Sequence, residues 1–213
     1  MRLVKPSFEI LQITPNPLGL IERAGRTCYK SEDKITANSK IDFASKILKM
    51  GHESVIEHSV MTVSFIVNRG VTHELVRHRL ASYSQESTRY CNYRGGVSFI
   101  VPCWTNIHAL DNLDREGLLL SDPMSNDGRW LRSMARAEDD YLALLEGGWA
   151  PQQARDVLPN ATKTEIVTTA NLREWRHIFK LRCSKKAHPQ MREIMRPLLT
   201  EVKQQIAVLY DAL

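Results

Sequence analysis

The densest group of chemically capable side chains in this sequence lies between residues 69 and 94. Arg77, His78 and Arg79 stand in a row, and Ser, Tyr, Gln, Glu and Thr side chains follow them over residues 82–90. Guanidinium groups bind phosphates through paired hydrogen bonds, and hydroxyls and amides satisfy the polar atoms of small ligands. The segment therefore indicates a site for a phosphorylated small molecule that makes many hydrogen bonds.

The elements around this segment must hold its side chains in place. A helix that starts near Gly70 and ends at about residue 79 would put Arg69, His73 and Arg77 on one face, because they are four apart. Consecutive residues cannot share a face, so the triplet 77–79 is predicted to serve different surfaces. Residues 82–96 are polar and contain glycine, which favours a loop. A solvated helix end followed by an ordinary polar loop fits the same residues, and the pattern alone leaves both interpretations open.

The rest of the chain predicts a mixed α+β fold. Apolar periodicity predicts helices over 16–29, 39–50, 127–146, 171–182 and about 189–209, with a short helix between Pro151 and Pro159. Runs of β-branched and aromatic residues predict strands over 59–67, 97–101 and 164–169, and residues 103–125 read as an irregular connection. We expect one domain over residues 1–213, with a small, mostly antiparallel sheet flanked by long helices.

Composition and charge exclude several classes of protein. The 213 residues are 43% apolar and 25% charged, and 29 basic against 24 acidic residues give a net charge of +5, which is too mild for a dense nucleic-acid surface. No apolar run approaches the roughly 20 residues that cross a membrane, and the first residues lack a signal peptide. The scattered cysteines form no Cys-x-x-Cys pair, so we expect a cytoplasmic protein with reduced thiols.

The spacing within the dense segment resembles a known family signature. The triplet Arg77-His78-Arg79, seven further residues, Ser87 and then Arg89-Tyr90 resemble the signature of the flavin-dependent thymidylate synthases. Further segments are similar to that family in order and approximate spacing over roughly residues 20–200. These are Gly51-His52-Glu53-Ser54 with Glu57-His58, Arg155-Asp156-Val157-Leu158-Pro159, and Asn171-Leu172-Arg173 followed by Arg182.

The resemblance implies an activity and its ligands. Proteins of this family methylate dUMP to dTMP, with methylenetetrahydrofolate as the carbon donor and NADPH as the reductant through bound FAD. They are homotetramers whose active sites lie at subunit interfaces. The resemblance thus implies four copies of this chain, with no nucleic-acid or membrane partner and no metal.

The resemblance also implies residue roles. Arg182 would face the uracil ring, where a fixed cation stabilises developing negative charge, and His52 would lie near the flavin ring. Ser87 joins Arg182 and His52 among the catalytic candidates, as a binding group rather than as a nucleophile. The dUMP candidates are Gln85, Ser87, Arg89, Arg155 and Arg182. The FAD candidates are Ser54, Glu57, Arg77, His78, Arg79, Asn171, Arg173 and His177.

Two positions depart from the family pattern. Many members have an acidic residue where Gln85 stands, and Glu86 is its neighbour, so the loop contacts over residues 84–87 have two possible registers. Many members have Asn where His177 stands. On one helix Arg173 and His177 share a face, whereas Arg182 is nine residues beyond Arg173 and half a turn out of phase. Such a helix would offer cofactor contacts on one side and a substrate contact on the other side or at its end.

The sequence suggests no covalent nucleophile. The four cysteines, Cys28, Cys91, Cys103 and Cys183, show no recognisable nucleophile context. No His or carboxylate in the sequence is clearly a base for Ser87. The resemblance implies a reaction without an enzyme-linked nucleotide, since the family is understood to work in that way.

A metal hydrolase is one alternative. His52, Glu53, Glu57 and His58 are able to bind a metal, and His73 and His78 follow. Zincin chemistry needs two His four apart on one helix with a Glu between them. His52 and His58 are six apart, which places them on different helical faces and disfavours this alternative.

An RNA-binding module is the second alternative. Arg77, Arg79, Arg89 and Arg94 alternate with tyrosines that could stack on bases, namely Tyr83, Tyr90 and Tyr93. The same groups equally suit a nucleotide and a dinucleotide-like cofactor. Acidic residues are spread among the basic ones, so the sequence shows no continuous track for a polyanion.

Overall fold

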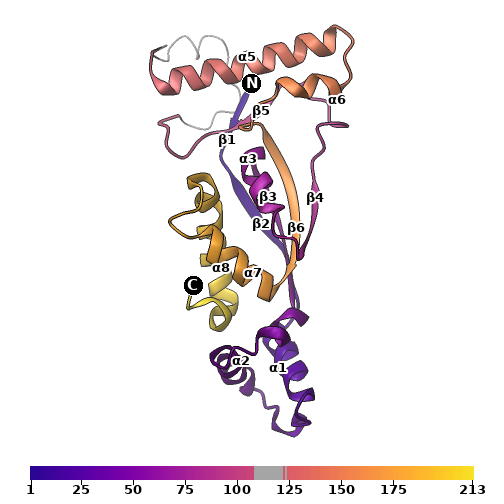
Figure 1. Ribbon diagram of the computed structural model, residues 1–213, viewed down its shortest axis with the longest axis vertical. Coiled ribbons are helices and arrows are strands. Elements are labelled where there is room, and N and C mark those ends of the chain that lie inside the picture. The colour runs from indigo at the N-terminus through magenta and orange to yellow at the C-terminus, as the bar shows by residue number, and fades with distance from the viewer. Residues whose placement is uncertain (108–121, 123) are drawn as a thin grey trace. The chain divides into compact units, whose positions relative to one another are not determined.

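The computed structural model describes residues 1–107, 122 and 124–213, and Figure 1 draws its elements. The strands are β1 (Arg2–Val4), β2 (Ser7–Ile13), β3 (Val60–Asn68), β4 (Ala81–Gln85), β5 (Ser98–Ile100) and β6 (Lys163–Asn171). The α-helices are α1 (Pro17–Thr27), α2 (Ser39–Lys49), α3 (Arg69–Leu75), α5 (Asn126–Glu146), α6 (Pro151–Ala154), α7 (Leu172–Arg182) and α8 (Pro189–Tyr210). Short 3-10 helices are η1 (Glu32–Lys34), η2 (Glu53–His58) and η3 (Arg155–Val157).

The chain divides into two compact units, each made of several stretches. Unit 1 consists of Met1–Ser7, Phe65–Leu75 and Ser84–Ile166. Unit 2 consists of Phe8–Ser64, Val76–Tyr83 and Val167–Leu213. Strands β3, β4 and β6 each contribute residues to both units, so no single cut in the sequence separates them. The expectation of one domain over residues 1–213 stays a prediction.

Four strands form a small sheet in the order β2-β3-β6-β4. In unit 2 the Thr62 hydroxyl lies 2.9 Å from the Thr169 hydroxyl, and the Leu172 amide donates to the Ser59 carbonyl at 2.8 Å. Residue numbers therefore rise along β3 while they fall along β6, which is antiparallel pairing. A separate pair, β1 and β5, is parallel. The predicted α+β class with a small antiparallel sheet is confirmed.

Alternation of buried and partly exposed side chains explains the long strands. Strand β3 buries every second residue from Met61 to Val67, and β6 does the same from Thr164 to Ala170. Side chains on a strand point alternately to opposite faces, so one apolar set faces the core. The β-branched content of both segments suits this arrangement.

Unit 1 is organised around helix α5, which packs on α6 (Figure 1). The Ser125 hydroxyl caps the helix and accepts the Gly128 amide at 3.0 Å. Tyr141 from α5 is buried with Leu3 and Phe99 from the two short strands. This core fixes the stretch that leads from β4 to β5.

Unit 2 is built on helix α7, which packs against α8 and η2. Trp175 and Phe179 from α7 form an aromatic row with Tyr210 from the end of α8, and all three are fully buried. The polar atoms of the row are satisfied: the Trp175 indole donates to the Met61 carbonyl at 3.0 Å, and the Tyr210 hydroxyl donates to the Leu172 carbonyl at 3.1 Å. Figure 1 shows α7 beside α8. Helix α7 is thus a rigid support for the side chains on its other faces.

Two local predictions were wrong. Helix α3 ends at Leu75, so Arg77 is not on a helix and does not share a face with Arg69 and His73. His78, three residues beyond the end of the helix, is buried and bonded to α7. Residues 82–85 belong to strand β4 rather than to a loop. Pairing with β6 overrides the polar composition of this segment.

The other predicted helices and strands agree with the structure to within a few residues. Pro17 and Pro189 each occupy the first helical turn, where a missing amide costs nothing. Strands β1 and β2 and the 3-10 helix η2 were not predicted. In the expected irregular stretch 103–125, residues 103–107 lack regular structure, and residues 108–121 and 123 lie outside the described residues. No helix among the described residues is long and apolar enough to cross a membrane.

Candidate active site

His78 is the centre of a polar cluster inside unit 2. It lies between α3 and β4 and is 5% exposed, whereas its neighbours Arg77 and Arg79 are exposed. The Tyr83 hydroxyl donates to the His78 carbonyl at 2.8 Å and so fixes the backbone of the triplet. The triplet therefore serves different surfaces, as predicted.

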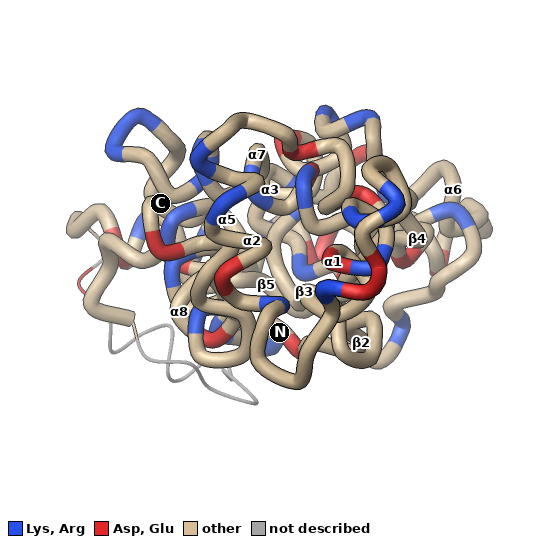
Figure 2. Tube along the Cα trace, turned by 90° about the horizontal axis from the view of Figure 1, so that it is seen from below, with Lys and Arg blue, Asp and Glu red and all other residues tan. Residues whose placement is uncertain are grey.

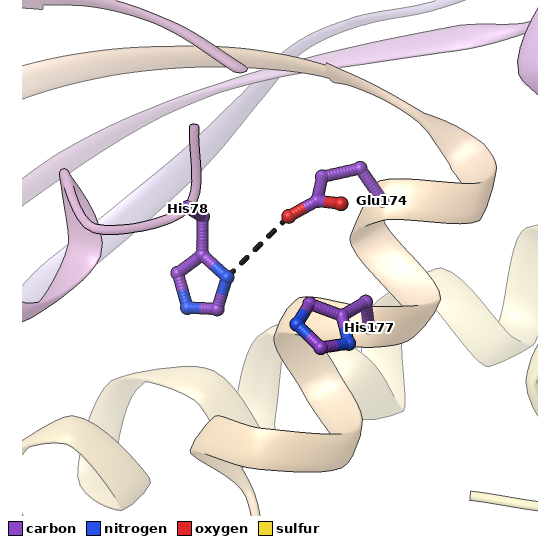
Figure 3. Close-up of side chains that lie close together, drawn as sticks. All are labelled: His78, Glu174 and His177. Carbon is purple, nitrogen blue, oxygen red and sulfur yellow. Dashed lines mark ion pairs between the residues drawn. The ribbon is translucent and has the colours of Figure 1, made fainter. Parts of the chain in front are cut away.

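Both ring nitrogens of His78 have partners on helix α7. The Arg182 Nε–H donates to His78 Nε2 at 2.9 Å, and His78 Nδ1 lies 3.4 Å from Glu174 Oε1 (Figure 3). The His177 ring lies edge-on to the His78 ring, with the ring centroids 5.7 Å apart. The cluster thus combines a neutral acceptor, a cation and a carboxyl group at the central residue of the signature triplet.

The electrostatics of the cluster keep His78 uncharged. Burial, with the positive charge of Arg182 and the proximity of His177, lowers the pKa of His78 to about 4. Burial also raises the pKa of Glu174 above its ordinary value, and His177 partly opposes that shift. Burial and the nearby Glu174 raise the pKa of Tyr83 to about 12, so its hydroxyl stays a donor. At neutral pH the imidazole is neutral and able to accept from the guanidinium.

The start of α7 is built by a capping interaction. The Asn171 side chain accepts the Glu174 amide at 2.8 Å, which satisfies one of the free amides of the first turn. Glu174 in that first turn also suits the positive end of the helix dipole. The Asn171 side chain, a predicted FAD contact, thus has a structural role as well.

A pocket of about 730 Å³ with both acidic and basic side chains opens beside this cluster in unit 2. Arg173 contacts Glu57 at 2.6 Å and Glu53 at 3.7 Å, and Arg176 contacts Glu53 at 3.3 Å. The buried Arg176 Nε has no hydrogen-bond partner among the described residues. The pocket is lined by Glu53, Glu57, Leu80, Asn171, Arg173, Glu174, Arg176, His177, Lys180, Ala212 and Leu213. It gathers four of the predicted FAD residues: Glu57, Asn171, Arg173 and His177.

His52 and Ser54 line a different pocket of unit 2. This pocket has a volume of about 680 Å³ and lies between α1, α2 and the start of η2. Both side chains are exposed, and the His52 amide donates to the Ile47 carbonyl at 2.9 Å. Tyr29 and Phe43 give this pocket an aromatic lining. The structure thus places Ser54 and Glu57, both predicted FAD residues, in two separate pockets.

In unit 1 the side chain of Gln85 is hydrogen-bonded to two threonines. Its amide nitrogen lies 3.0 Å from the Thr72 hydroxyl and 3.2 Å from the Thr164 hydroxyl. The adjacent Glu86 accepts from the Tyr93 hydroxyl at 2.7 Å and contacts Lys163 at 3.0 Å. Gln85 and Glu86, the two residues between which the family pattern left the register open, therefore both contact strand β6.

The remaining nucleotide candidates of unit 1 make mostly neutral contacts. Ser87 Oγ accepts the Arg89 amide at 3.3 Å, and the Arg89 guanidinium lies over the Tyr90 ring at 5.3 Å. Arg155 Nη1 donates to the buried hydroxyl of Thr88 at 3.2 Å. No His or carboxylate among the described residues is hydrogen-bonded to Ser87 Oγ, which agrees with a binding role.

The structure sorts the predicted site residues by unit. Unit 2 holds every FAD candidate, together with His52 and Arg182. Unit 1 holds the other dUMP candidates, Gln85, Ser87, Arg89 and Arg155. Within unit 2 the structure joins Arg182, a substrate candidate, directly to His78, a cofactor candidate.

Sequence reasoning missed three partners of these residues. Glu174 faces His78, Arg176 pairs with Glu53, and Thr88 receives Arg155. The Asn171-x-x-Glu174 pattern, a cap residue followed three positions later by an acid, was the one available signal for Glu174. The other two contacts join segments far apart in the sequence, so spacing carries no signal for them.

The residues that come close enough to share a metal ion differ from the set around His52 and His58 that the sequence suggested. Among the described residues, His78, Glu174 and His177 bring their possible ligand atoms within 4.8 Å of one another (Figure 3). His78 binding a cation through Nδ1 would carry its proton on Nε2, where the Arg182 donor already points. The adjacent guanidinium also repels a cation. The donor arrangement therefore disfavours a metal site.

The basic residues of the RNA alternative are not gathered in one unit. Arg77 and Arg79 belong to unit 2, whereas Arg89 and Arg94 belong to unit 1. Figure 2 shows Lys and Arg positions on many elements, with Asp and Glu among them. This distribution gives no support for a polyanion track on any one element.

The fold is shared with solved nucleotide methylases and synthases. The structure matches a UMP/dUMP methylase, PolB from Streptomyces cacaoi, with a TM-score of 0.77 and 26% identity over 100% of this chain and 96% of that one. It matches Thymidylate Synthase X from Helicobacter pylori, solved with FAD and dUMP, with a TM-score of 0.73 and 23% identity over 96% of this chain and 99% of that one. These matches show that the chain has the α+β fold of these proteins.

Sequence comparison names the family. The family model described as thymidylate synthase complementing protein matches residues 9–206. A flavin-dependent thymidylate synthase from Geobacter sulfurreducens is 37% identical over 91% of this chain and 81% of its own length. One from Pyrococcus horikoshii is 31% identical over 91% of this chain and 78% of its own length. The chain belongs to the flavin-dependent thymidylate synthase family.

Proposed function

We propose that this chain converts dUMP to dTMP by reductive methylation. Methylenetetrahydrofolate is the carbon donor, NADPH is the reductant through bound FAD, and the enzyme forms no covalent bond to the nucleotide. The observation that carries the proposal is the direct bond from Arg182 to His78 of the signature triplet, in a chain that belongs to this family. This bond holds the Arg182 guanidinium against His78, the central residue of the triplet.

The chemistry of the mixed-charge pocket in unit 2 supports FAD binding. Its volume of about 730 Å³ lies within the range of cofactor pockets, and three cations, Arg173, Arg176 and Lys180, line it together with three acids, Glu53, Glu57 and Glu174. Arginine forks suit a diphosphate, and the buried Arg176 Nε is an unused donor among the described residues. We assign Arg77, Arg79, Asn171, Arg173, His177, Ser54, Glu57 and His78 to FAD. FAD supplies hydride transfer when it is bound.

We assign Gln85, Ser87, Arg89, Arg155 and Arg182 to dUMP. Arg89 and Arg155 are suited to the phosphate, because a guanidinium binds phosphate oxygens in pairs. Arg182 would stabilise the negative charge that develops on the pyrimidine when its C5 becomes nucleophilic. His52 would orient the folate or nicotinamide near the flavin.

A mechanism without a covalent nucleophile is supported by the surroundings of Cys183 and Ser87. Burial raises the pKa of Cys183 to about 11, which makes it a poor nucleophile at neutral pH. Ser87 Oγ is hydrogen-bonded to the Arg89 amide and lacks a general base among the described residues. Activation of the pyrimidine is therefore assigned to electrostatics.

We further propose a homotetramer with active sites at the subunit interfaces. Helices α1 and α2 and the segments that follow them carry exposed apolar side chains, namely Leu20, Tyr29, Ile35, Ile41 and Met50. Exposed apolar groups gathered in one part of a chain are typical of interaction surfaces. The pocket that contains His52 and Ser54 includes Tyr29 and Met50, which supports an interfacial site. Light scattering on a sizing column would measure the mass directly.

Formation of dTMP by the purified protein tests the reaction. The reaction contains dUMP, methylenetetrahydrofolate and NADPH, and each component and FAD is omitted in turn. Product that requires all four is the expected result. Folded, flavin-loaded protein that makes no dTMP would contradict the proposal, and protein that binds no flavin would also contradict the cofactor assignment.

A further inference from the structure

The bond between Arg182 and His78 constrains the proton on the imidazole. The guanidinium has donors and no acceptor, so His78 Nε2 must offer its lone pair to the Arg182 Nε–H at 2.9 Å. An imidazolium or an Nε2–H imidazole would point a hydrogen at another hydrogen. The proton of the neutral ring therefore belongs on Nδ1.

Glu174 is the group that faces this Nδ1. Its Oε1 lies 3.4 Å away, and the Glu174 side chain is nearly as buried as that of His78. A carboxyl oxygen that accepts the Nδ1–H stabilises this tautomer over the other one. The remaining groups at His78 are the His177 ring and the Tyr83 hydroxyl, and the hydroxyl is bonded to the backbone carbonyl rather than to the ring.

Helix α7 holds both ends of this chain of contacts. Glu174 lies in its first turn and is fixed there through the Asn171 cap, whereas Arg182 is its last residue. His78 comes from another segment and touches both. The backbone of one helix connects Glu174 and Arg182, and its hydrogen bonds hold it in place. A displacement of the Glu174 side chain therefore reaches the Arg182 side chain through the imidazole, which contacts both.

We propose that Glu174 is a positioning residue: it holds His78 in the Nδ1–H tautomer, and His78 Nε2 then orients the Arg182 guanidinium. The tautomer of His78 and the orientation of Arg182 follow from the contacts alone. Only the consequence, that Arg182 is aligned with the pyrimidine, rests on the proposed function. In this role Glu174 acts through His78, whereas its place in the lining of the pocket assigned to FAD is a separate contact. A fixed imidazole tautomer set by a carboxylate is a known means of orienting a catalytic group.

The tautomer is measured without turnover. Nitrogen-15 spectra of flavin-loaded protein with labelled histidine, assigned with His78→Gln, give the protonation of each ring nitrogen. We expect His78 to be neutral and protonated on Nδ1 at pH 7. In Glu174→Ala we expect that preference to be lost and the Arg182 Nε–H signal to exchange faster. A charged His78, or a tautomer that Glu174→Ala leaves unchanged, would overturn the inference.

Kinetics then test the consequence for the reaction. Glu174→Ala should lower kcat for dTMP formation about tenfold, with FAD content unchanged, because Arg182 loses its orientation. Glu174→Gln keeps an acceptor oxygen and should recover much of the rate. Glu201→Ala, which removes an exposed carboxylate on α8, is the matched control and should equal the wild type.

The two arms separate the failure of this inference from the failure of the proposed function. Wild-type protein that makes dTMP, with Glu174→Ala equally active and its tautomer unchanged, refutes the positioning role alone. Wild-type protein that makes no dTMP refutes the function, while the spectra still decide the link between Glu174, His78 and Arg182. Melting curves and the Glu174→Gln variant show whether a loss in Glu174→Ala reflects unfolding.

Discussion

The substrate candidates of unit 1 and the cofactor candidates of unit 2 are held by different kinds of contact. In unit 1, Gln85 and Arg155 are hydrogen-bonded to threonine hydroxyls. In unit 2, His78 is buried between a cation and a carboxyl group, and Arg173 is paired with two acids. Neutral hydroxyl contacts are easily exchanged for a phosphate, whereas the buried contacts of His78 with charged groups are expensive to break. The ion pairs of Arg173 are exposed and contribute less. Unit 1 is thus suited to exchanging a ligand, and unit 2 to keeping a fixed electrostatic arrangement.

Removal of Arg182 is the most damaging change that this comparison predicts. Arg182→Ala removes the cation and leaves His78 Nε2 without its donor. We expect kcat/KM for dUMP to fall by about 10²–10³-fold, as for the loss of one preorganised donor. Steady-state dTMP formation with FAD content measured in parallel gives the value. Arg182→Lys keeps the charge without the planar fork and should retain part of the activity; equal activity of wild type and Arg182→Ala would remove Arg182 from the mechanism.

The buried imidazole of unit 2 predicts a loss of stability in acid. The pKa of His78 is 6.5 when unfolded and about 4 when folded, so between these values the unfolded chain binds more protons. The free energy of unfolding therefore falls as the pH falls from 6.5 to 4, by at most about 3 kcal/mol. Urea unfolding over this range measures the slope.

The control for this stability change is His78→Gln, whose amide can accept from Arg182 and donate to Glu174 without titrating. The raised pKa of Glu174 acts in the opposite direction and is present in both proteins, so the difference between the two curves isolates His78. Identical pH profiles of wild type and variant would show that the imidazole is not a buried neutral base.

Arg155 tests the exchangeable character of unit 1. Arg155→Ala should raise the KM for dUMP about tenfold with little change in kcat, because it removes phosphate binding that ground and transition states share. Thr88→Val removes only the hydroxyl that Arg155 contacts and should change KM less. Arg136→Ala, an exposed arginine on α5, is the control. A fall in kcat at constant KM would place Arg155 in the chemical step instead.

Local sequence was sufficient for much of the fold. Helices α1 and α8 begin at Pro17 and Pro189 and carry clear apolar periodicity, so their boundaries follow from nearby residues. Strand β4 was predicted as a loop because its residues are polar, and its pairing with β6 is not visible in the local sequence. The end of α3 was misplaced, because the helix ends at Leu75 and the local pattern held no signal for the tertiary contact that His78 makes just beyond it.

For the candidate site too, local sequence pointed to the segment but not to its distant partners. The residue types and spacing of the signature pointed to the segment 77–89, and the structure shows His78 buried among polar partners there. The partners themselves are about 100 residues away, as in the contact of His78 with Arg182, and no spacing rule reaches that far. Glu174 is the clearest case, because its cap position was visible in the sequence while its contact with His78 was not.

The smallest expected effect concerns Ser87, a dUMP candidate of unit 1 whose hydroxyl was weighed above as a nucleophile. Ser87→Ala removes a hydroxyl that accepts the Arg89 amide and has no described base. We expect turnover to fall by less than about tenfold, because a binding group contributes one hydrogen bond of roughly 1 kcal/mol. Single-turnover formation of dTMP with dUMP affinity measured separately decides the role. Complete loss of product with dUMP and FAD still bound would make Ser87 part of the chemistry, and unit 1 would then hold a reacting group as well as the substrate.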